Sequence, residues 1–111
     1  INFYKNFKPV DYLKIIKNSE CLIGNSSSGI RESSYLGVPV VNIGKRQNLR
    51  ERGNNVVDCN LKVSNIISSV KKIKNKKIVK SKVYGSGNSV TKIIKILNTL
   101  NPKIEKKFYG I

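Results

Sequence analysis

The chain has 111 residues, enough for one small domain or for part of a larger one. It carries 22 Lys and Arg residues against 6 Asp and Glu residues, which gives a formal net charge of +16. No run of apolar residues approaches the roughly 18 to 20 of a membrane-spanning helix. The sequence also lacks His and any CxxC spacing, so a zinc site is excluded as a working hypothesis.

The positive charge has two interpretations. It can indicate an anionic partner such as nucleic acid or a membrane surface. It can also reflect biased composition, which we favour because 18 of the basic residues are Lys, spread along the chain among many Asn and Ile. The four Arg residues differ, since all of them lie within residues 31–52. Arg suits planar, bidentate contact with phosphate or carboxylate, so we interpret Lys as background and Arg as placed.

The first part of the chain alternates between helix and buried strand. Residues 1–8 hold three aromatic side chains and are predicted to form a strand end and a loop. A helix is predicted over about 9–18, because its apolar residues recur at helical spacing and Pro9 suits the first helical position. The apolar run at 21–24 predicts a strand, and a helix is expected from about 28 to 36.

The second part continues the same alternation. It is predicted to hold a buried strand, a basic loop, a short strand and two amphipathic helices, at 40–43, 44–55, 56–57, 61–74 and 90–100. A terminal segment, 102–111, needs a neighbour to bury its apolar side chains. The order predicts an α/β fold with a parallel, Rossmann-like sheet. Because few strands are present, and the chain begins at Ile1 without any Met, we expect residues 1–111 to be a single partial domain of a longer protein.

The segment GNSSSGIRE at 24–32, here called the serine loop, joins a predicted strand to a predicted helix. The free N–H groups of a first helical turn attract anions, small residues allow close approach, and serine hydroxyls add donors. A flexible serine-rich linker is the alternative. The short length favours phosphate or nucleotide binding, although the pattern is neither a P-loop nor GxGxxG.

Three charged residues extend this prediction. Glu32 lies four residues after Ser28, where its carboxylate is suited to accept hydrogen bonds from a ribose diol or, equally, to serve as an ordinary helix or capping residue. Arg46 follows the second buried strand at its carboxyl end, where ligands bind in open α/β sheets. If the two strands are neighbours, Arg46 and the serine loop lie side by side, with Arg50 four residues on. A solvated basic loop is the alternative.

Several features of catalytic sites are missing. There is no His to activate Ser26, Ser27 or Ser28, and none of the six acidic residues makes an obvious pair. We therefore assign no catalytic residue, cofactor or metal to the chain and expect the acid and base groups elsewhere. The segment YGSG at 84–87 is interpreted as a plain turn, with an aromatic face near a ligand as the alternative. Two cysteines without a signal peptide favour a reduced, cytoplasmic protein.

Three motifs carry a family resemblance: CLIGNSSSGIRE at 21–32, VPVVNIGKRQ at 38–47 and NVV at 55–57. They resemble the hydrolysing branch of the UDP-N-acetylglucosamine 2-epimerase family, and YGSG with the helix after it resembles the end of that family's sequences. The similarity covers nearly the whole chain. Two positions depart from the family pattern: Leu49 stands where members commonly have Gly, and Ser86 stands where they usually have an acid.

The resemblance implies a GT-B architecture of two Rossmann-like domains, with this chain in the later part of the second, UDP-binding domain. Ser26 and Ser27 would contact the diphosphate, Glu32 the ribose hydroxyls, and Arg46 the phosphates or the sugar. The catalytic carboxylates and His would lie in an N-terminal domain absent here, so the chain alone would be inactive. A full-length homo-oligomer would convert UDP-GlcNAc and water into N-acetylmannosamine and UDP, for sialic-acid-type biosynthesis.

The expected UDP-binding set comprises Ser26, Ser27, Ser28, Gly29, Glu32, Arg46 and Arg50. Three alternatives stay open. One is an epimerase acting on UDP-N,N'-diacetylbacillosamine, another is a relative that binds a UDP-sugar without turnover, and the third is a basic nucleic-acid-binding module. We expect no membrane or nucleic-acid partner for the preferred function.

Overall fold

A computed structural model describes residues 1–101. Its centre is a parallel sheet of three strands in the order β1 (Leu22–Gly24), β2 (Val40–Ile43) and β3 (Val56–Cys59). Leu22 pairs with Val40 of β2, and Val40 pairs with Val56 of β3. The predicted parallel sheet is confirmed, and its third strand is two residues longer than the sequence suggested.

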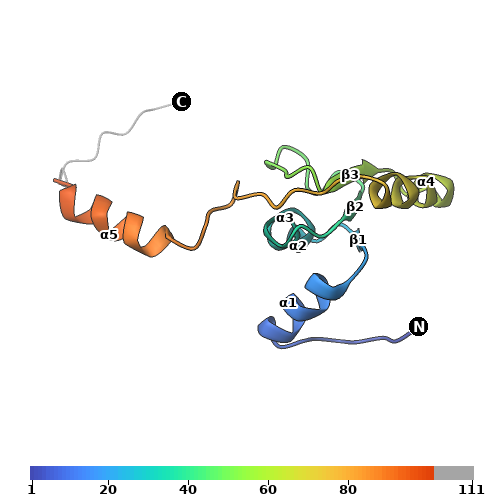
Figure 1. Cartoon of the computed structure of the whole chain (residues 1–111), viewed down its shortest axis with the longest axis horizontal. Coiled ribbons are helices and arrows are strands. Elements are labelled where there is room, and N and C mark those ends of the chain that lie inside the picture. The colour runs from blue at the N-terminus through green and yellow to red at the C-terminus, as the bar shows by residue number, and fades with distance from the viewer. Residues whose placement is uncertain (102–111) are drawn as a thin grey trace, which may run out of the picture.

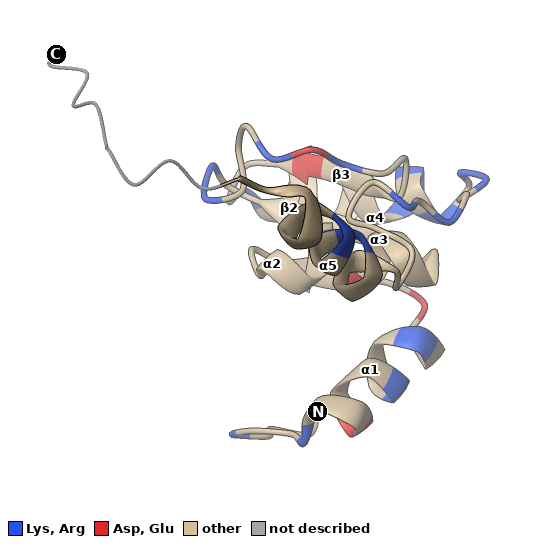
Figure 2. Cartoon of the chain, turned by 90° about the vertical axis from the view of Figure 1, so that its left-hand side faces the viewer, with Lys and Arg blue, Asp and Glu red and all other residues tan. Residues whose placement is uncertain are grey.

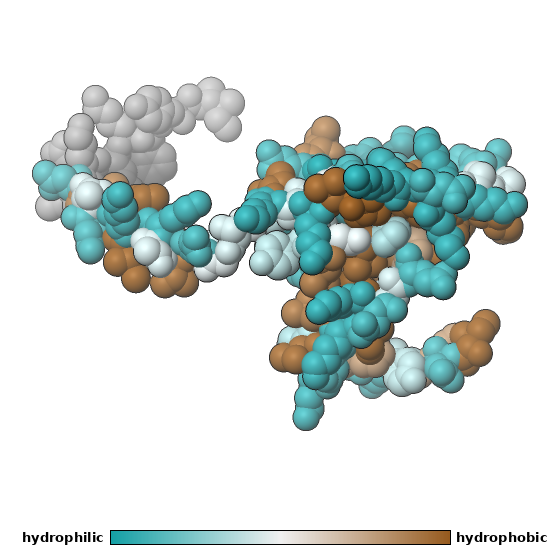
Figure 3. All heavy atoms as spheres, in the orientation of Figure 1, coloured by the Kyte–Doolittle hydropathy of each residue, from teal (hydrophilic) through white to brown (hydrophobic). Residues whose placement is uncertain are grey.

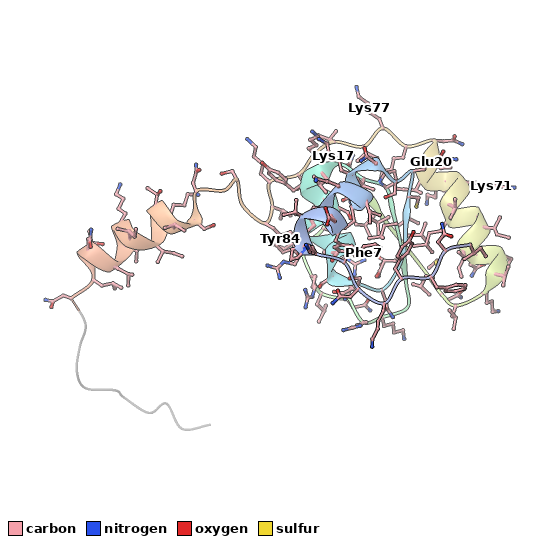
Figure 4. The ribbon with its side chains drawn as sticks, turned by 90° about the horizontal axis from the view of Figure 1, so that it is seen from below. Phe7, Lys17, Glu20, Lys71, Lys77 and Tyr84 are labelled. Carbon is pink, nitrogen blue, oxygen red and sulfur yellow. The ribbon has the colours of Figure 1, made fainter. Side chains whose placement is uncertain are left out.

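Helices cover both faces of the sheet and complete a three-layer, Rossmann-like arrangement (Figures 1 and 4). The short helices α2 (Ser27–Ile30) and α3 (Glu32–Leu36) lie on one side, and α4 (Val63–Lys74) lies on the other. The buried apolar side chains of this core are Ile16, Ile30, Val38, Val40, Val41 and Ile73. Val40 and Val41 are both buried because successive side chains of a strand point to opposite faces, and both faces of β2 are covered.

Helix α1 (Pro9–Asn18) begins at its proline, as predicted, and buries Ile16. The prediction of a strand end within residues 1–8 is wrong, because this segment forms no strand. Its aromatic side chains pack on one another instead: the Tyr4 and Phe7 ring centroids lie 4.9 Å apart, and those of Phe7 and Tyr12 lie 6.3 Å apart. The segment is therefore held by contacts among aromatic side chains and not by pairing with a strand of the sheet.

The single helix predicted over 28–36 is divided at Arg31, which has φ −94° and ψ −71°. Glu32 therefore does not continue the helical turn of Ser28. Glycine and serine are weak helix formers, so the local sequence does little to hold one regular helix here. The predicted stop at Gly37 is confirmed, since this residue adopts the left-handed conformation with φ 74°.

Helix α5 (Ser89–Thr99) stands apart from the sheet in Figures 1 and 4, connected to it by residues 75–88. The predicted amphipathic helix is confirmed, and Figure 3 shows its apolar atoms gathered on one side. These apolar side chains are between 52% and 68% exposed: Val90, Ile93, Ile94, Ile96 and Leu97. The predicted terminal segment at 102–111 lies outside the described residues. In the described part of the chain, every helix is too short or too polar to cross a bilayer.

Candidate functional site

The serine loop leaves β1 at the carboxyl edge of the sheet and enters α2. Ser26 is the N-cap of α2, and its Oγ accepts a hydrogen bond of 3.3 Å from the backbone N–H of Ser28. Ser26 is exposed, while Ser27 and Ser28 are half-buried. Because a helix of four residues has a small dipole, the hydroxyl and N–H groups themselves are the donors that this loop can offer to an anion.

Gly29 has a packing reason for its size. A Cβ atom at this position would lie 2.9 Å from Cγ1 of Val40 and 3.5 Å from Cδ2 of Leu22. The missing side chain thus allows α2 to lie directly on β1 and β2. Its predicted contact with UDP stays a prediction.

The basic loop, residues 44–55, lies beside the serine loop, because β1 and β2 are neighbouring parallel strands. A direct hydrogen bond joins the two loops: Gln47 Nε2 donates to the backbone oxygen of Asn25 over 2.8 Å. Gln47 is only 2% exposed. The side chains of Arg46 and Arg50 are exposed and form no ion pair or hydrogen bond with residues 1–101. The two loops are thus brought together, and both guanidinium groups remain accessible from solvent.

Arg52 has a structural part in this loop that the sequence did not reveal. Its guanidinium forms an ion pair with Asp58 of β3 and donates to the backbone oxygen of Gln47. Asn42 of β2 donates to the other oxygen of Asp58 over 2.6 Å. These contacts fix the basic loop to the carboxyl ends of two strands.

Leu49 has an unusual backbone conformation, with φ 65°. It is the sole non-glycine residue with positive φ within 1–101. The left-handed region costs a residue with a Cβ roughly 1–2 kcal/mol. Leu49 is also fully exposed, so no packing offsets that cost. The left-handed backbone thus gives a physical reason why glycine would suit this position better than leucine. The strained residue lies between Arg46 and Arg50.

Glu32 faces a cavity of about 530 Å³. The cavity lies between α1, α3 and the segment 81–89, and its wall includes Leu13, Arg31, Glu32, Tyr35, Ser81 and Tyr84. The Oε2 atom of Glu32 is buried and has no hydrogen-bond partner among residues 1–101. A buried polar atom without a partner is destabilising, and a donor bound beside Glu32 would remove that cost. Four other side-chain oxygens of the described residues are also buried without a partner, those of Ser33, Ser34, Gln47 and Asn55.

Tyr84 belongs to the wall of the same cavity. The turn favoured from sequence is present, with the N–H of Gly85 donating to the backbone oxygen of Lys82 over 2.8 Å, and an aromatic face near a ligand stays a prediction. The hydroxyl of Tyr84 donates to the backbone oxygen of Glu51 over 2.6 Å. The Arg31 guanidinium carbon lies 5.8 Å from the centroid of its ring. Figure 4 shows Tyr84 where the chain leaves the sheet toward α5. In the sequence, only the presence of an aromatic residue within a glycine-rich turn pointed to these contacts of Tyr84.

Charges elsewhere on the surface are dispersed. Figure 2 shows Lys and Arg distributed over loops and helices rather than gathered on one face. One exposed ion pair joins Lys74 of α4 to Glu20 over 2.7 Å. Hydrogen bonding with Lys74 lowers the pKa of Glu20 and raises that of Lys74. Burial of the half-buried Cys21 thiol raises its pKa, and neither cysteine forms a disulfide.

Comparison with known proteins identifies the group to which these loops belong. The model of the UDP-N-acetylglucosamine 2-epimerase family matches residues 1–98. The chain is 36% identical to the UDP-N,N'-diacetylbacillosamine 2-epimerase (hydrolyzing) of Legionella pneumophila, over 90% of the chain and 27% of that protein. It is 39% identical to the polysialic acid biosynthesis protein P7 of Escherichia coli, over 91% of the chain and 28% of that protein.

A third relative, the GDP/UDP-N,N'-diacetylbacillosamine 2-epimerase (hydrolyzing) of Campylobacter jejuni, is 44% identical over half of the chain and 14% of its own length. The chain therefore spans about a quarter of the length of the first two relatives. The matched region includes the serine loop, Glu32, the basic loop and Tyr84. By this match and by its parallel α/β fold, the chain belongs to the UDP-N-acetylglucosamine 2-epimerase family.

Proposed function

We propose that this chain forms the UDP-binding part of a hydrolysing UDP-N-acetylglucosamine 2-epimerase, which converts UDP-GlcNAc and water into N-acetylmannosamine and UDP. The observation that carries the proposal is the buried, unpartnered Oε2 of Glu32 in the wall of the cavity. A ribose diol supplies hydroxyl donors for such an oxygen, and its binding would remove the cost of leaving the oxygen unsatisfied. The description of the matching family, UDP-N-acetylglucosamine 2-epimerase, supports UDP as the nucleotide in this proposal.

The serine loop and the basic loop have the chemistry that a diphosphate requires. Their side chains at Ser26, Ser27, Ser28, Arg46 and Arg50 do not line the cavity at Glu32, so the diphosphate is proposed to bind outside that cavity. In the proposal, the hydroxyl groups of Ser26, Ser27 and Ser28 and the N–H groups of Ser26 and Ser27 donate to the phosphates, because the N–H of Ser28 already donates to Ser26 Oγ. Arg46 and Arg50 approach the same charge from the basic loop, which Gln47 holds against the serine loop. A carboxylate would repel a phosphate, so Glu32 is assigned to the ribose rather than to the diphosphate.

The chemical steps are assigned to residues outside this chain. The proposal places the chain in the second domain of a GT-B enzyme, with an N-terminal domain of the same protein completing the site and with a homo-oligomer as the full-length assembly. Here the chain holds the UDP leaving group while carboxylate and His groups of the other domain carry out proton transfer. We propose a cytoplasmic location, in keeping with two free cysteines.

The sugar has a second candidate. The relatives from Legionella pneumophila and Campylobacter jejuni are named for diacetylbacillosamine substrates, whereas the Escherichia coli relative is named for polysialic acid biosynthesis. Offering the full-length protein UDP-GlcNAc and UDP-N,N'-diacetylbacillosamine separately, and detecting the free sugar and UDP, distinguishes the two. Binding of either nucleotide sugar without release of UDP would indicate a non-catalytic relative. Salt-sensitive retention of DNA or RNA without UDP binding would favour the nucleic-acid alternative.

UDP binding itself is tested by Arg46→Ala. Charge-assisted hydrogen bonds contribute about 1.5–3 kcal/mol, and since Arg46 is exposed we expect the lower end, a loss of about tenfold in UDP affinity by calorimetry. Lys74→Ala removes a positive charge on the far side of the sheet and should leave the affinity within about twofold. Equal effects of the two substitutions would refute the assignment of Arg46.

A further inference from the structure

Tyr84 is the point at which three separate segments of the candidate site meet. Its hydroxyl holds the backbone of the basic loop at Glu51, between the two arginines Arg50 and Arg52. Its ring lies beneath the guanidinium of Arg31. Arg31 is both the last cap of α2 and the first cap of α3, so it directly precedes Glu32. One side chain thus contacts the serine-loop side and the arginine side of the site together.

The backbone segment that precedes Tyr84 is itself hydrogen-bonded to α3 and to the basic loop. The N–H of Ser81 donates to the backbone oxygen of Ser34 in α3 over 3.0 Å. Upstream, Asn54 of the basic loop donates to the oxygen of Lys77 and accepts from the N–H of Val79, both over 3.0 Å. These bonds fix the segment that precedes Tyr84, so the backbone position from which Tyr84 contacts Glu51 is itself held in place.

We infer that Tyr84 is a positioning residue that holds the basic loop and the Arg31–Glu32 junction in the arrangement that binds the nucleotide, an inference that rests on the proposed function. Gln47 and Arg52 hold the basic loop at two points, but between them lie the strained Leu49 and the exposed Arg50, whose side chains make no hydrogen bond with residues 1–101. The hydrogen bond from Tyr84 adds a constraint from outside the loop. Ring contact with Arg31 ties the same constraint to Glu32.

The inference makes a quantitative statement about affinity. If only a fraction of molecules hold the loop correctly, apparent affinity falls by that fraction. Loss of one hydrogen bond lowers the equilibrium constant for the ordered arrangement by about three- to tenfold, and UDP affinity should decrease by at most that factor. At saturating substrate the ligand restores the arrangement, so KM should rise while kcat is preserved.

The experiment compares Tyr84→Phe with Tyr12→Phe in the full-length protein. Tyr84→Phe removes the hydroxyl but keeps the ring over Arg31. Tyr12→Phe removes a hydroxyl from α1, outside the cavity wall, where that group makes no hydrogen bond with residues 1–101. UDP affinity is measured by calorimetry, and amide hydrogen exchange of residues 45–52 is followed with and without UDP. A fourth protein, Glu32→Gln, reports on the proposed ribose contact.

We expect Tyr84→Phe to weaken UDP binding by up to about tenfold and to speed exchange of the basic loop, with exchange slowed again by saturating UDP. Tyr12→Phe should match the parent protein in both. Melting temperatures of the two variants should agree within about 2 °C, which separates positioning from a loss of folding. If Tyr84→Phe binds UDP as Tyr12→Phe does while Glu32→Gln binds weakly, the positioning inference is overturned and the proposed function stands. If the parent full-length protein shows no binding of UDP, the proposed function itself has failed.

Discussion

Replacing Glu32 with Leu should stabilise the ligand-free protein and weaken its binding of UDP. The buried Oε2 atom has no partner among residues 1–101, and an unsatisfied buried polar group costs about 1–3 kcal/mol. Against this, Glu32 is an acidic residue in the first turn of α3, a favourable position worth about 0.3–1 kcal/mol. Leu is as good a helix former as Glu and would face Leu13 and Tyr35 in the cavity wall. The net expectation is a gain of about 1 kcal/mol in the free energy of unfolding.

The same substitution removes the proposed acceptor for the ribose. A hydrogen bond to a charged acceptor contributes about 1.5–3 kcal/mol, so UDP affinity should fall by about 10- to 150-fold. Denaturant unfolding and calorimetric titration of the full-length protein measure the two quantities. Glu20→Leu is the matched control, because it removes an exposed carboxylate far from the cavity and should leave UDP affinity within about twofold.

A destabilising effect of Glu32→Leu without UDP would refute the reasoning, since it would mean that the carboxylate already has favourable partners. Unchanged UDP affinity would separately refute its assignment to the ribose.

Two further predictions concern the basic loop and the ion pair on α4. Leu49→Gly should raise the free energy of unfolding by about 0.5–1 kcal/mol, because relief of the left-handed strain at φ 65° exceeds the added chain entropy of glycine; a decrease in denaturant unfolding experiments would contradict this. The lowered pKa of Glu20 contributes stability that is present above its usual value of 4.5 and is lost as the pH falls through the lowered pKa. Lys74→Gln should remove this small acid-range dependence while leaving stability near neutral pH almost unchanged, and equal pH profiles for both proteins in low salt would contradict the assignment.

The sequence predicted those parts of the fold that depend on local patterns. Apolar runs at β1 and β2, the helical spacing in α1, α4 and α5, and the stop at Gly37 all appear in the structure. Parallel order followed from the alternation of these elements, and that order alone placed the serine loop beside the basic loop.

The details of the candidate site depend on long-range contacts that local patterns do not encode. Gln47 is a polar residue in a polar loop, and its burial arises from a hydrogen bond to a residue 22 positions earlier. Tyr84 contacts Glu51 across 33 positions. The break at Arg31 likewise divides a segment whose apolar and polar residues fit one helix. Residue identity therefore indicated the chemistry of the site, while the connections that hold it together appear only in three dimensions.

Helix α5 has a consequence for its own folding equilibrium. It has 11 residues, and isolated helices shorter than about 12–15 residues are marginal in water. All of its residues are exposed, so it gains little packing energy from the described body of the chain. The helical fraction of α5 should therefore increase when another surface covers its apolar side chains. Its helicity, measured by amide exchange or by circular dichroism, consequently reports whether another surface packs against α5.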